Sequence, residues 1–376
     1  MLCVWPPFPI AITDYSDSMS GVDNIIAALE QRDRVCDITL DDIPGSKMDK
    51  LVPAMLGPFP LLEGIVLGAI DSEMAAVPDS FLCGSAPQLQ WLTFHAIPFS
   101  AMPTLLFSAR NLIGLQLSGI PRSGYISPEV MVTCLSAMPC LGNLRLQFDS
   151  SQSFPNLNNQ HHHHLARSTL RALRELIIGG FDEYFEDFVA RIDTPVMRTL
   201  EITFIERYFY DFSRLSQFIC RVEVFKSLAH ADIMMYNVAA EVSASLRTGT
   251  GGPAQLSLGI SCNELLPRLQ FFLAVCSATL LPFSNIGSLD ISCLPQLQQS
   301  QGELFAGCLW LDLLRSFSTV KALAIDENSL TPIAYALKEV VEKMITEIFP
   351  AIQELPIGEK LPSGPILRVV EEFAAA

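Results

Sequence analysis

The chain has 376 residues, of which half are apolar and 17% are charged, and its formal net charge at pH 7 is −16. This composition excludes an intrinsically disordered chain, which would be poor in apolar residues and rich in charge. It also argues against a nucleic-acid-binding protein, because an acidic surface without a basic patch is repelled by phosphate backbones.

The first part of the chain, residues 1–35, is predicted to hold one helix, over residues 22–32, and to act as a partial cap on the structure that follows. The first ten residues carry no basic side chain, and Pro6, Pro7 and Pro9 interrupt any apolar run. A secretory signal is therefore not expected.

From residue 36 to residue 376 a short pattern recurs about every 29 residues: an apolar residue, two others, then Leu-x-Leu or a close variant. Clear copies begin at Leu62, Leu89, Leu112, Leu141, Leu173, Met197, Ile286, Val320 and Ile352, and weaker copies centre on Ile38, Leu228 and Leu256. A spacing of this size fits one strand and one helix per turn of a solenoid. The sequence therefore predicts an α/β fold: a leucine-rich-repeat solenoid (horseshoe) of about 12 irregular strand–helix repeats, with parallel strands on the concave face.

Helices are expected between the strands. Apolar residues recur at helical spacing over residues 181–192 and 331–349, and a helix near residues 365–375 is predicted to cap the array in part. Residues 150–168 are low in complexity and are predicted to form a flexible loop between repeats. The uncharged window 269–289 is interpreted as a buried helix, a turn at Pro282 and a strand, because its polar residues argue against a membrane span.

The ten cysteines show no CxxC spacing, so they are interpreted as reduced residues of an apolar core and not as zinc ligands or disulfides. Together with the missing signal, this pattern leads us to expect a cytoplasmic and/or nuclear protein.

The amino-acid sequences of several segments point to a family more specifically than the repeat pattern does. These segments are Trp5–Ile10, Gly21–Glu30, Asp33–Ile38, Tyr184–Pro195, Leu200–Phe204 and Leu215–Ile219. They resemble the repeat region of F-box proteins of mushroom-forming fungi. The resemblance implies a repeat domain that recruits a protein target to a ubiquitin ligase. The F-box itself is not visible, so a Skp1-type adaptor is expected as a partner only if an F-box lies upstream.

Other candidate chemistry is weak. His161–His164 could bind a metal, but the tract is better explained by a loop, and residues 248–253 lack the lysine and helix of a phosphate-binding loop. Four carboxylates between Asp182 and Asp187 are interpreted as a solvated helix face, and His95 and His230 are read as isolated. No catalytic, cofactor or metal site is predicted, and the chain is not expected to be an enzyme.

Alternate positions of each predicted strand should point to the concave face, where solenoids commonly bind partners. The predicted partner-binding residues are Thr39, Asp41, Asp42, Thr93, His95, Gln116, Ser118, Arg145, Gln147, Glu201, Thr203, Asp290, Ser292, Asp326 and Glu327. Acids outnumber bases among them, so a basic protein partner is expected, without nucleic acid or membrane. The favoured function is a non-enzymatic interaction scaffold, the target-recruiting domain of an F-box-type receptor. The alternative is a boxless repeat protein with a structural or inhibitory role unrelated to ubiquitin.

Overall fold

The computed structural model describes residues 8–15, 21–71, 76–148, 167–205, 212–236, 239–246, 254–262, 265–278, 285–293, 309–310 and 312–326. The chain divides into two compact units. Unit 1 comprises Met1–Gly180 and Asp187–Val196, and unit 2 comprises Phe181–Glu186 and Met197–Ala376.

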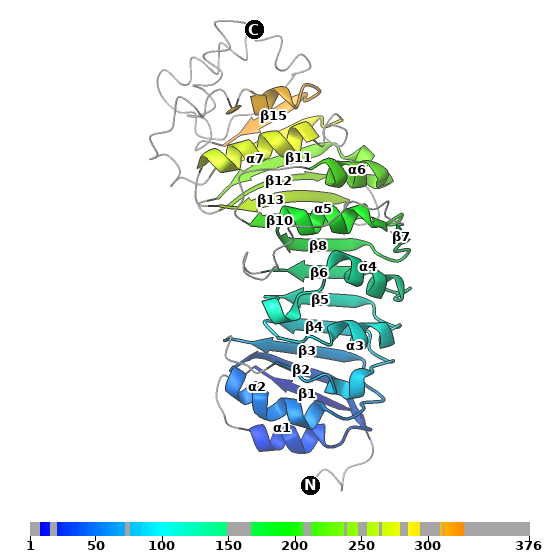
Figure 1. Ribbon diagram of the computed structural model, residues 1–376. Helices are drawn as coiled ribbons and strands as arrows, with labels where there is room; N and C mark the ends of the chain where they lie inside the picture. The colour runs from blue at the N-terminus through cyan, green and yellow to red at the C-terminus, as the bar shows by residue number, and fades with distance from the viewer. Residues whose placement is uncertain are drawn as a thin grey trace, which may run out of the picture. The chain divides into compact units, whose positions relative to one another are not determined.

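In unit 1 the strands lie side by side in chain order, and every neighbouring pair is parallel (Figure 1). They are β1 (Ile10–Asp14), β2 (Val35–Ile43), β3 (Gly64–Ala69), β4 (Trp91–His95), β5 (Gly114–Ser118), β6 (Asn143–Gln147) and β8 (Glu175–Gly180). The strands predicted from the repeat pattern in this unit are thus confirmed. Strand β1 was not predicted, because residues 8–15 lack the Leu-x-Leu pattern.

The repeat pattern forms a buried ladder of side chains. Ile38, Ile65, Leu92, Leu115 and Leu144 are aligned as Cα partners on successive strands, and each is at most 2% exposed. Apolar burial on this scale is the dominant favourable term in folding, so the ladder explains why the pattern recurs along the chain.

Short helical segments connect the strands of unit 1 and lie on one side of the sheet (Figure 1). The α-helices are α1 (Val22–Leu29), α2 (Gly45–Leu51), α3 (Met102–Ser108) and α4 (Pro128–Ser136); the 3₁₀ segments are η2 (Val52–Met55), η3 (Phe81–Gly84) and η4 (Arg122–Gly124). A helix in every repeat was predicted, but the described residues between β3 and β4 contain only η3, which turns through left-handed backbone at Leu82 and Cys83. A 27-residue repeat can be closed by such a compact turn, which leaves no regular stretch for an α-helix.

Three further elements of the chain follow β6. Strands β7 (Ser168–Thr169) and β9 (Ile192–Asp193) form a separate parallel pair, and α5 (Asp182–Ala190) confirms the helix predicted over residues 181–192.

Unit 2 departs from a simple repeat. Its strands are β10 (Thr199–Ile205), β11 (His230–Met235), β12 (Ala239–Ser245), β13 (Gln255–Ser261), β14 (Ser288–Cys293) and β15 (Ala322–Ile325), and their spatial order is β10-β13-β12-β11-β14-β15. Strand β12 is antiparallel to both of its neighbours, whereas the other pairs in this unit are parallel. The prediction of parallel strands throughout is therefore wrong at β12.

The weak copies of the pattern explain this departure. Strand β11 begins two residues after Leu228, the centre of one weak copy, and β12 has no copy at all. Strand β12 instead alternates small side chains in the sequence AAEVSAS, which buries Ala240, Val242 and Ala244. A strand whose buried residues are small does not match a pattern defined by leucine, so β12 was missed.

Helices α6 (Ser213–Arg221) and α7 (Leu265–Ala278) and the 3₁₀ segment η6 (Glu223–Ser227) connect the strands of unit 2. The core of this unit holds an aromatic cluster, in which the ring of Phe204 lies 5.1 Å from Phe212 and 5.6 Å from Phe271. The buried side chain of Arg268 on α7 donates hydrogen bonds to the carbonyl oxygens of Tyr236 and Cys262, which directly follow β11 and β13.

Helix α7 and strand β14 confirm the helix and the strand expected in the window 269–289, whereas the turn at Pro282 lies outside the described residues. Among the described residues, no helix has both the length and the apolar character needed to cross a membrane. The predicted helices over residues 331–349 and 365–375, the His161–His164 tract and nearly all of the 150–168 and 248–253 loops also lie outside the described residues.

Candidate functional site

Each sheet has one face whose side chains form the buried ladder and a second face on which the alternate residues lie. We call the second face the open face. In unit 1 its middle row contains Thr39, Thr93, Gln116 and Arg145, which are linked through Val66 as Cα partners on successive strands. All four were predicted for the partner-binding face, and all four are partly exposed.

The remaining predicted residues of unit 1 lie at the carboxyl ends of the strands. His95 is exposed and its Nδ1 lies 3.1 Å from Oγ of Ser118, which is itself only 8% exposed. Gln147 is the Cα partner of Gly179. Asp41 and Asp42 lie at the irregular end of β2, where Asp42 has a left-handed φ of 56°.

Trp91 is a feature of the open face that the sequence interpretation missed. Its side chain is 49% exposed, and a Cβ atom placed on Gly114 of the next strand would overlap the indole ring. The ring therefore lies across β5, and a side chain at position 114 would displace it. Gly64 and Gly114 flank Trp91 at the same register position, so an alignment of the repeats would have shown the large residue between two glycines.

A shallow hollow of about 120 Å³ adjoins this ring. It is lined by Trp91, Thr93, Gly114, Leu115, Gln116, Asn143, Leu144, Arg145, Glu175 and Ile177. Nε of Arg145 is buried and has no hydrogen-bond partner among the described residues. A buried donor without a partner is costly, so this atom favours a ligand that brings an acceptor.

One acidic residue, Glu175, lines the hollow, and two more lie on the same face of the sheet. Asp37 and Asp41 lean over β3, since a Cβ atom on Gly64 or Gly68 would overlap their carboxylates. Within the described part of the chain, neither of these aspartates nor Glu175 forms an ion pair. The open face of unit 1 therefore carries three carboxylates that form no ion pair with the described residues, beside one basic side chain, that of Arg145.

The open face of unit 2 carries four of the other predicted residues: Glu201, Thr203, Asp290 and Ser292. Glu201 begins a row of Cα partners that continues through Ser257, Ser243 and Asp232 to Asp290. Thr203 and Ser292 belong to a second row, which also holds Glu241. Asp326 directly follows β15, and its backbone N–H donates to the carbonyl oxygen of Ile291 at 3.0 Å. Glu327 lies outside the described residues.

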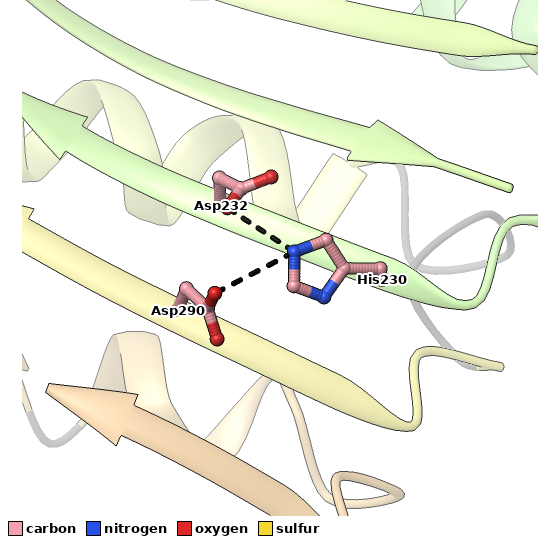
Figure 2. Close-up of side chains that lie close together, drawn as sticks. All are labelled: His230, Asp232 and Asp290. Atoms are coloured by element: carbon pink, nitrogen blue, oxygen red, sulfur yellow. Dashed lines mark hydrogen bonds and ion pairs between the residues drawn. The ribbon is translucent and has the colours of Figure 1, made fainter. Parts of the chain in front are cut away.

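His230 is not isolated, contrary to its interpretation from the sequence. Its Nε2 lies 3.2 Å from Oδ1 of Asp232 and 3.7 Å from Oδ2 of Asp290 (Figure 2). Asp232 is two residues along the same strand, and Asp290 is the Cα partner of Asp232 on β14. The motif His-x-Asp is visible in the sequence, but its neighbour Asp290 is not, because β12 and β13 intervene between β11 and β14 in the chain.

The acidic helix α5 is more than the solvated face predicted for it. The Glu186 carboxylate accepts hydrogen bonds from the backbone N–H groups of Arg214 and Leu215 at 2.8 and 3.0 Å. Asp187 pairs with Arg191 four residues later, with an Nε–Oδ2 distance of 3.1 Å. Both carboxylates therefore have structural partners.

The cysteines only partly form core residues. Seven cysteines are free thiols; among them Cys134 and Cys276 are buried, whereas Cys83 and Cys140 are exposed. Burial raises the pKa of the Cys134 thiol to about 11, and burial also raises the pKa of Cys276. Both buried thiols therefore stay protonated and unreactive at neutral pH.

Comparison with known proteins gives a distant likeness to a solved structure. No family model matches the chain, and no curated protein matches it. Among solved structures, the chain is similar to the leucine-rich repeat-containing protein LegL7 from Legionella pneumophila, at 14% identity over 98% of this chain and 97% of that one, with a TM-score of 0.32. That score is too low to support an argument, so the assignment of a leucine-rich-repeat type of solenoid depends on the buried ladder and the parallel strands of the chain itself.

Proposed function

We propose that the chain is a non-enzymatic protein-binding scaffold, and that the open face of unit 1 binds an extended basic segment of a partner protein. The observation that carries this proposal is Trp91, a large aromatic side chain that is half exposed beside a hollow on a sheet face. Exposed tryptophan is costly to leave in water and is enriched among the residues that dominate binding energy at interfaces.

The charges around Trp91 favour a basic partner. The carboxylates of Asp37, Asp41 and Glu175 form no ion pair with described residues, and a lysine or arginine of the partner would satisfy them. A cation placed over the indole of Trp91 would add a cation–π contact worth about 0.5–2 kcal/mol. Arg145 would then donate to a backbone carbonyl of the bound segment, which gives its Nε the acceptor that it lacks.

A binding selection tests this proposal. A random peptide library displayed on phage is selected against the whole chain, and dissociation constants of the enriched peptides are measured by fluorescence anisotropy. We expect the enriched peptides to be rich in lysine and arginine, and Trp91→Ala to weaken their binding by about tenfold, the equivalent of 1.4 kcal/mol. Exchanging Glu175→Gln together with Asp37→Asn should weaken binding further and reduce its dependence on salt.

The matched control is Phe107→Ala, which removes an aromatic side chain of similar exposure (43%) from α3 on the helical side of unit 1. It should leave peptide binding unchanged. Peptides without basic residues, or peptides that bind Trp91→Ala as tightly as the original chain, would contradict the proposal.

The finer proposal is that this scaffold recruits targets to a ubiquitin ligase. It is supported by the resemblance to the repeat region of F-box proteins and not by the geometry of the face. A tagged chain captured from its own cells and read by mass spectrometry should bring down a Skp1-type adaptor and a cullin through a salt wash. A reproducible protein partner without those two would favour the alternative, a boxless repeat protein.

A further inference from the structure

A second cluster, on the open face of unit 2, is independent of the peptide-binding proposal. His230 and Asp232 project from alternate positions of β11, so they share one face of the strand, and Asp290 projects beside them from β14 (Figure 2). The side chains are 17%, 35% and 43% exposed, so the cluster is partly shielded but open to solvent.

The cluster places two carboxylates on neighbouring strands. Asp232 and Asp290 face each other directly across a strand pair, where like charges destabilise a sheet. Among the described residues, the one group that pairs with Asp232 is the imidazole of His230, and no lysine or arginine does so. A second source of positive charge would relieve the repulsion between the two carboxylates.

The distances suit a small metal ion. Carboxylate oxygens and imidazole nitrogens bind Zn²⁺ at about 2.0–2.2 Å, so two ligands of a tetrahedral ion lie about 3.3–3.5 Å apart. The observed separations of 3.2 and 3.7 Å from Nε2 to the two carboxylate oxygens lie close to this range. One ligand atom from each of the three residues can be chosen so that all lie within 4.8 Å of one another.

We propose that His230, Asp232 and Asp290 bind one divalent metal ion, and that this ion is Zn²⁺. An imidazole ligand favours Zn²⁺ over Ca²⁺ and Mg²⁺, which take oxygen ligands. Three protein ligands leave a fourth position of a tetrahedral ion for water or for a donor from a bound partner. Because all three ligands lie on paired strands, the site is held by the sheet and not by a loop.

The second ring nitrogen of His230 limits the affinity. In metal sites the other imidazole N–H usually donates to a carboxylate or carbonyl, and loss of that partner costs 10–100-fold in affinity. Nδ1 of His230 is buried and has no hydrogen-bond partner among the described residues. We therefore expect binding weaker by about that factor than in a site whose histidine has such a partner.

The test is a metal titration of the full chain in which His161–His164 are replaced by glutamine, because that tract could bind metal by itself. Co²⁺ is titrated by visible absorption, and Zn²⁺ is titrated by calorimetry in the absence of other ligands. We expect one ion per chain, with ligand-field bands and no thiolate-to-metal charge-transfer band. His230→Gln should lower the affinity at least tenfold, and Asp290→Asn should do the same.

The matched control is His95→Gln, which removes a histidine from the open face of unit 1 that contacts Ser118 and forms no ion pair with the described residues. It should not alter binding of either ion. Circular dichroism without metal shows whether each variant is folded, and Asp232→Asn provides a third, nearly isosteric variant. The proposal is overturned if the tract-free chain binds no ion, if the Co²⁺ spectrum shows thiolate ligation, or if folded His230→Gln and Asp290→Asn bind as the parent does.

Discussion

At the scale of single residues, the structure contains a buried ion pair that local sequence could not indicate. Lys47 on α2 is completely buried, and its Nζ lies 2.7 Å from Oδ2 of Asp14, whose side chain is 15% exposed. Removing one member of such a pair is costly because the other is left as a desolvated charge, whereas replacing both by apolar groups is often neutral. Since Asp14 ends the unpredicted strand β1, its meeting with Lys47 was not visible in the sequence.

Lys47→Ala should therefore loosen the start of unit 1. We expect the free energy of opening of β1 and α2 to fall by about 3 kcal/mol, the lower end of the range for broken buried pairs, because Asp14 keeps some contact with water. Hydrogen–deuterium exchange of peptides that cover these elements measures the change. The double variant Lys47→Met with Asp14→Leu should recover most of the protection, and equal loss in both variants would contradict the assignment of the effect to charge.

The residue scale also shows what alternation along a strand can predict. Thr39, Thr93, Gln116 and Arg145 were placed on one face because the period of two is a local property, and the register confirms that they form one row. The contacts of Trp91 and His230 could not be predicted in this way. Each depends on which strand lies alongside, and for His230 that neighbour is nearly sixty residues away in the chain.

At the scale of elements, one helix depends on another for its N-terminus. The N-cap of α6 is Phe212, which provides no side-chain hydrogen bond, and the backbone N–H groups of Arg214 and Leu215 instead donate to Glu186 of α5. A carboxylate at this position also interacts favourably with the helix dipole. The acidic residues of α5 therefore serve the packing of the following helix, a role that their spacing alone could not reveal.

Glu186→Ala should destabilise α6 by about 1–2 kcal/mol, the usual cost of losing an N-cap acceptor. Glu186→Gln keeps one acceptor oxygen and the shape of the side chain, so its cost should be smaller. Limited proteolysis of the segment 212–228 and exchange of the α6 amides measure both effects. If the two variants were equally stable, the charge and acceptors of Glu186 would have no part in holding α6.

Strands that coincide with a copy of the leucine pattern, clear or weak, were predicted well, and strands without a copy were missed. Strands β2 to β6, β8 and β10 coincide with copies of the repeat, as do β13, β14 and β15. Strand β12 escaped because its buried side chains are small, and its direction depends on a hairpin with β11 and not on a helical crossover. Antiparallel strands can be joined by a short hairpin, so they need neither the length of a repeat nor its leucine pattern.

At the scale of the whole molecule, buried weak acids make the fold sensitive to alkaline pH. Desolvation by burial raises the pKa of the Cys134 thiol from 9.0 to about 11, and burial, together with the charge of Asp187, raises the pKa of the Tyr125 hydroxyl from 10.0 to about 12. The unfolded chain loses these protons at lower pH than the folded chain. Stability from this source is complete below pH 9 and is lost as pH rises through these folded-state values.

We therefore expect the melting temperature to fall progressively as the pH is raised above 9. Cys134→Ala removes one of these groups, so its melting temperature should change less steeply between pH 9 and 11. Scanning calorimetry at a fixed ionic strength measures both slopes. An unchanged slope in Cys134→Ala would show that this thiol does not titrate differently in the folded and unfolded chains.

The strand order of unit 2 has a consequence for how the chain assembles as it leaves the ribosome. In unit 1 the partner of each new strand has already been synthesised, because that partner is always the preceding strand of the same sheet. In unit 2 the edge of β10 must wait until β13 emerges, although β11 becomes available some 25 residues earlier. At about 5–20 residues per second, that interval lasts seconds, far longer than a strand needs to pair. Strand β11 runs in the same direction as β13 and could therefore pair with β10 in its place. The nascent chain must avoid this incorrect pairing, or break it, before β12 and β13 can be inserted between β10 and β11.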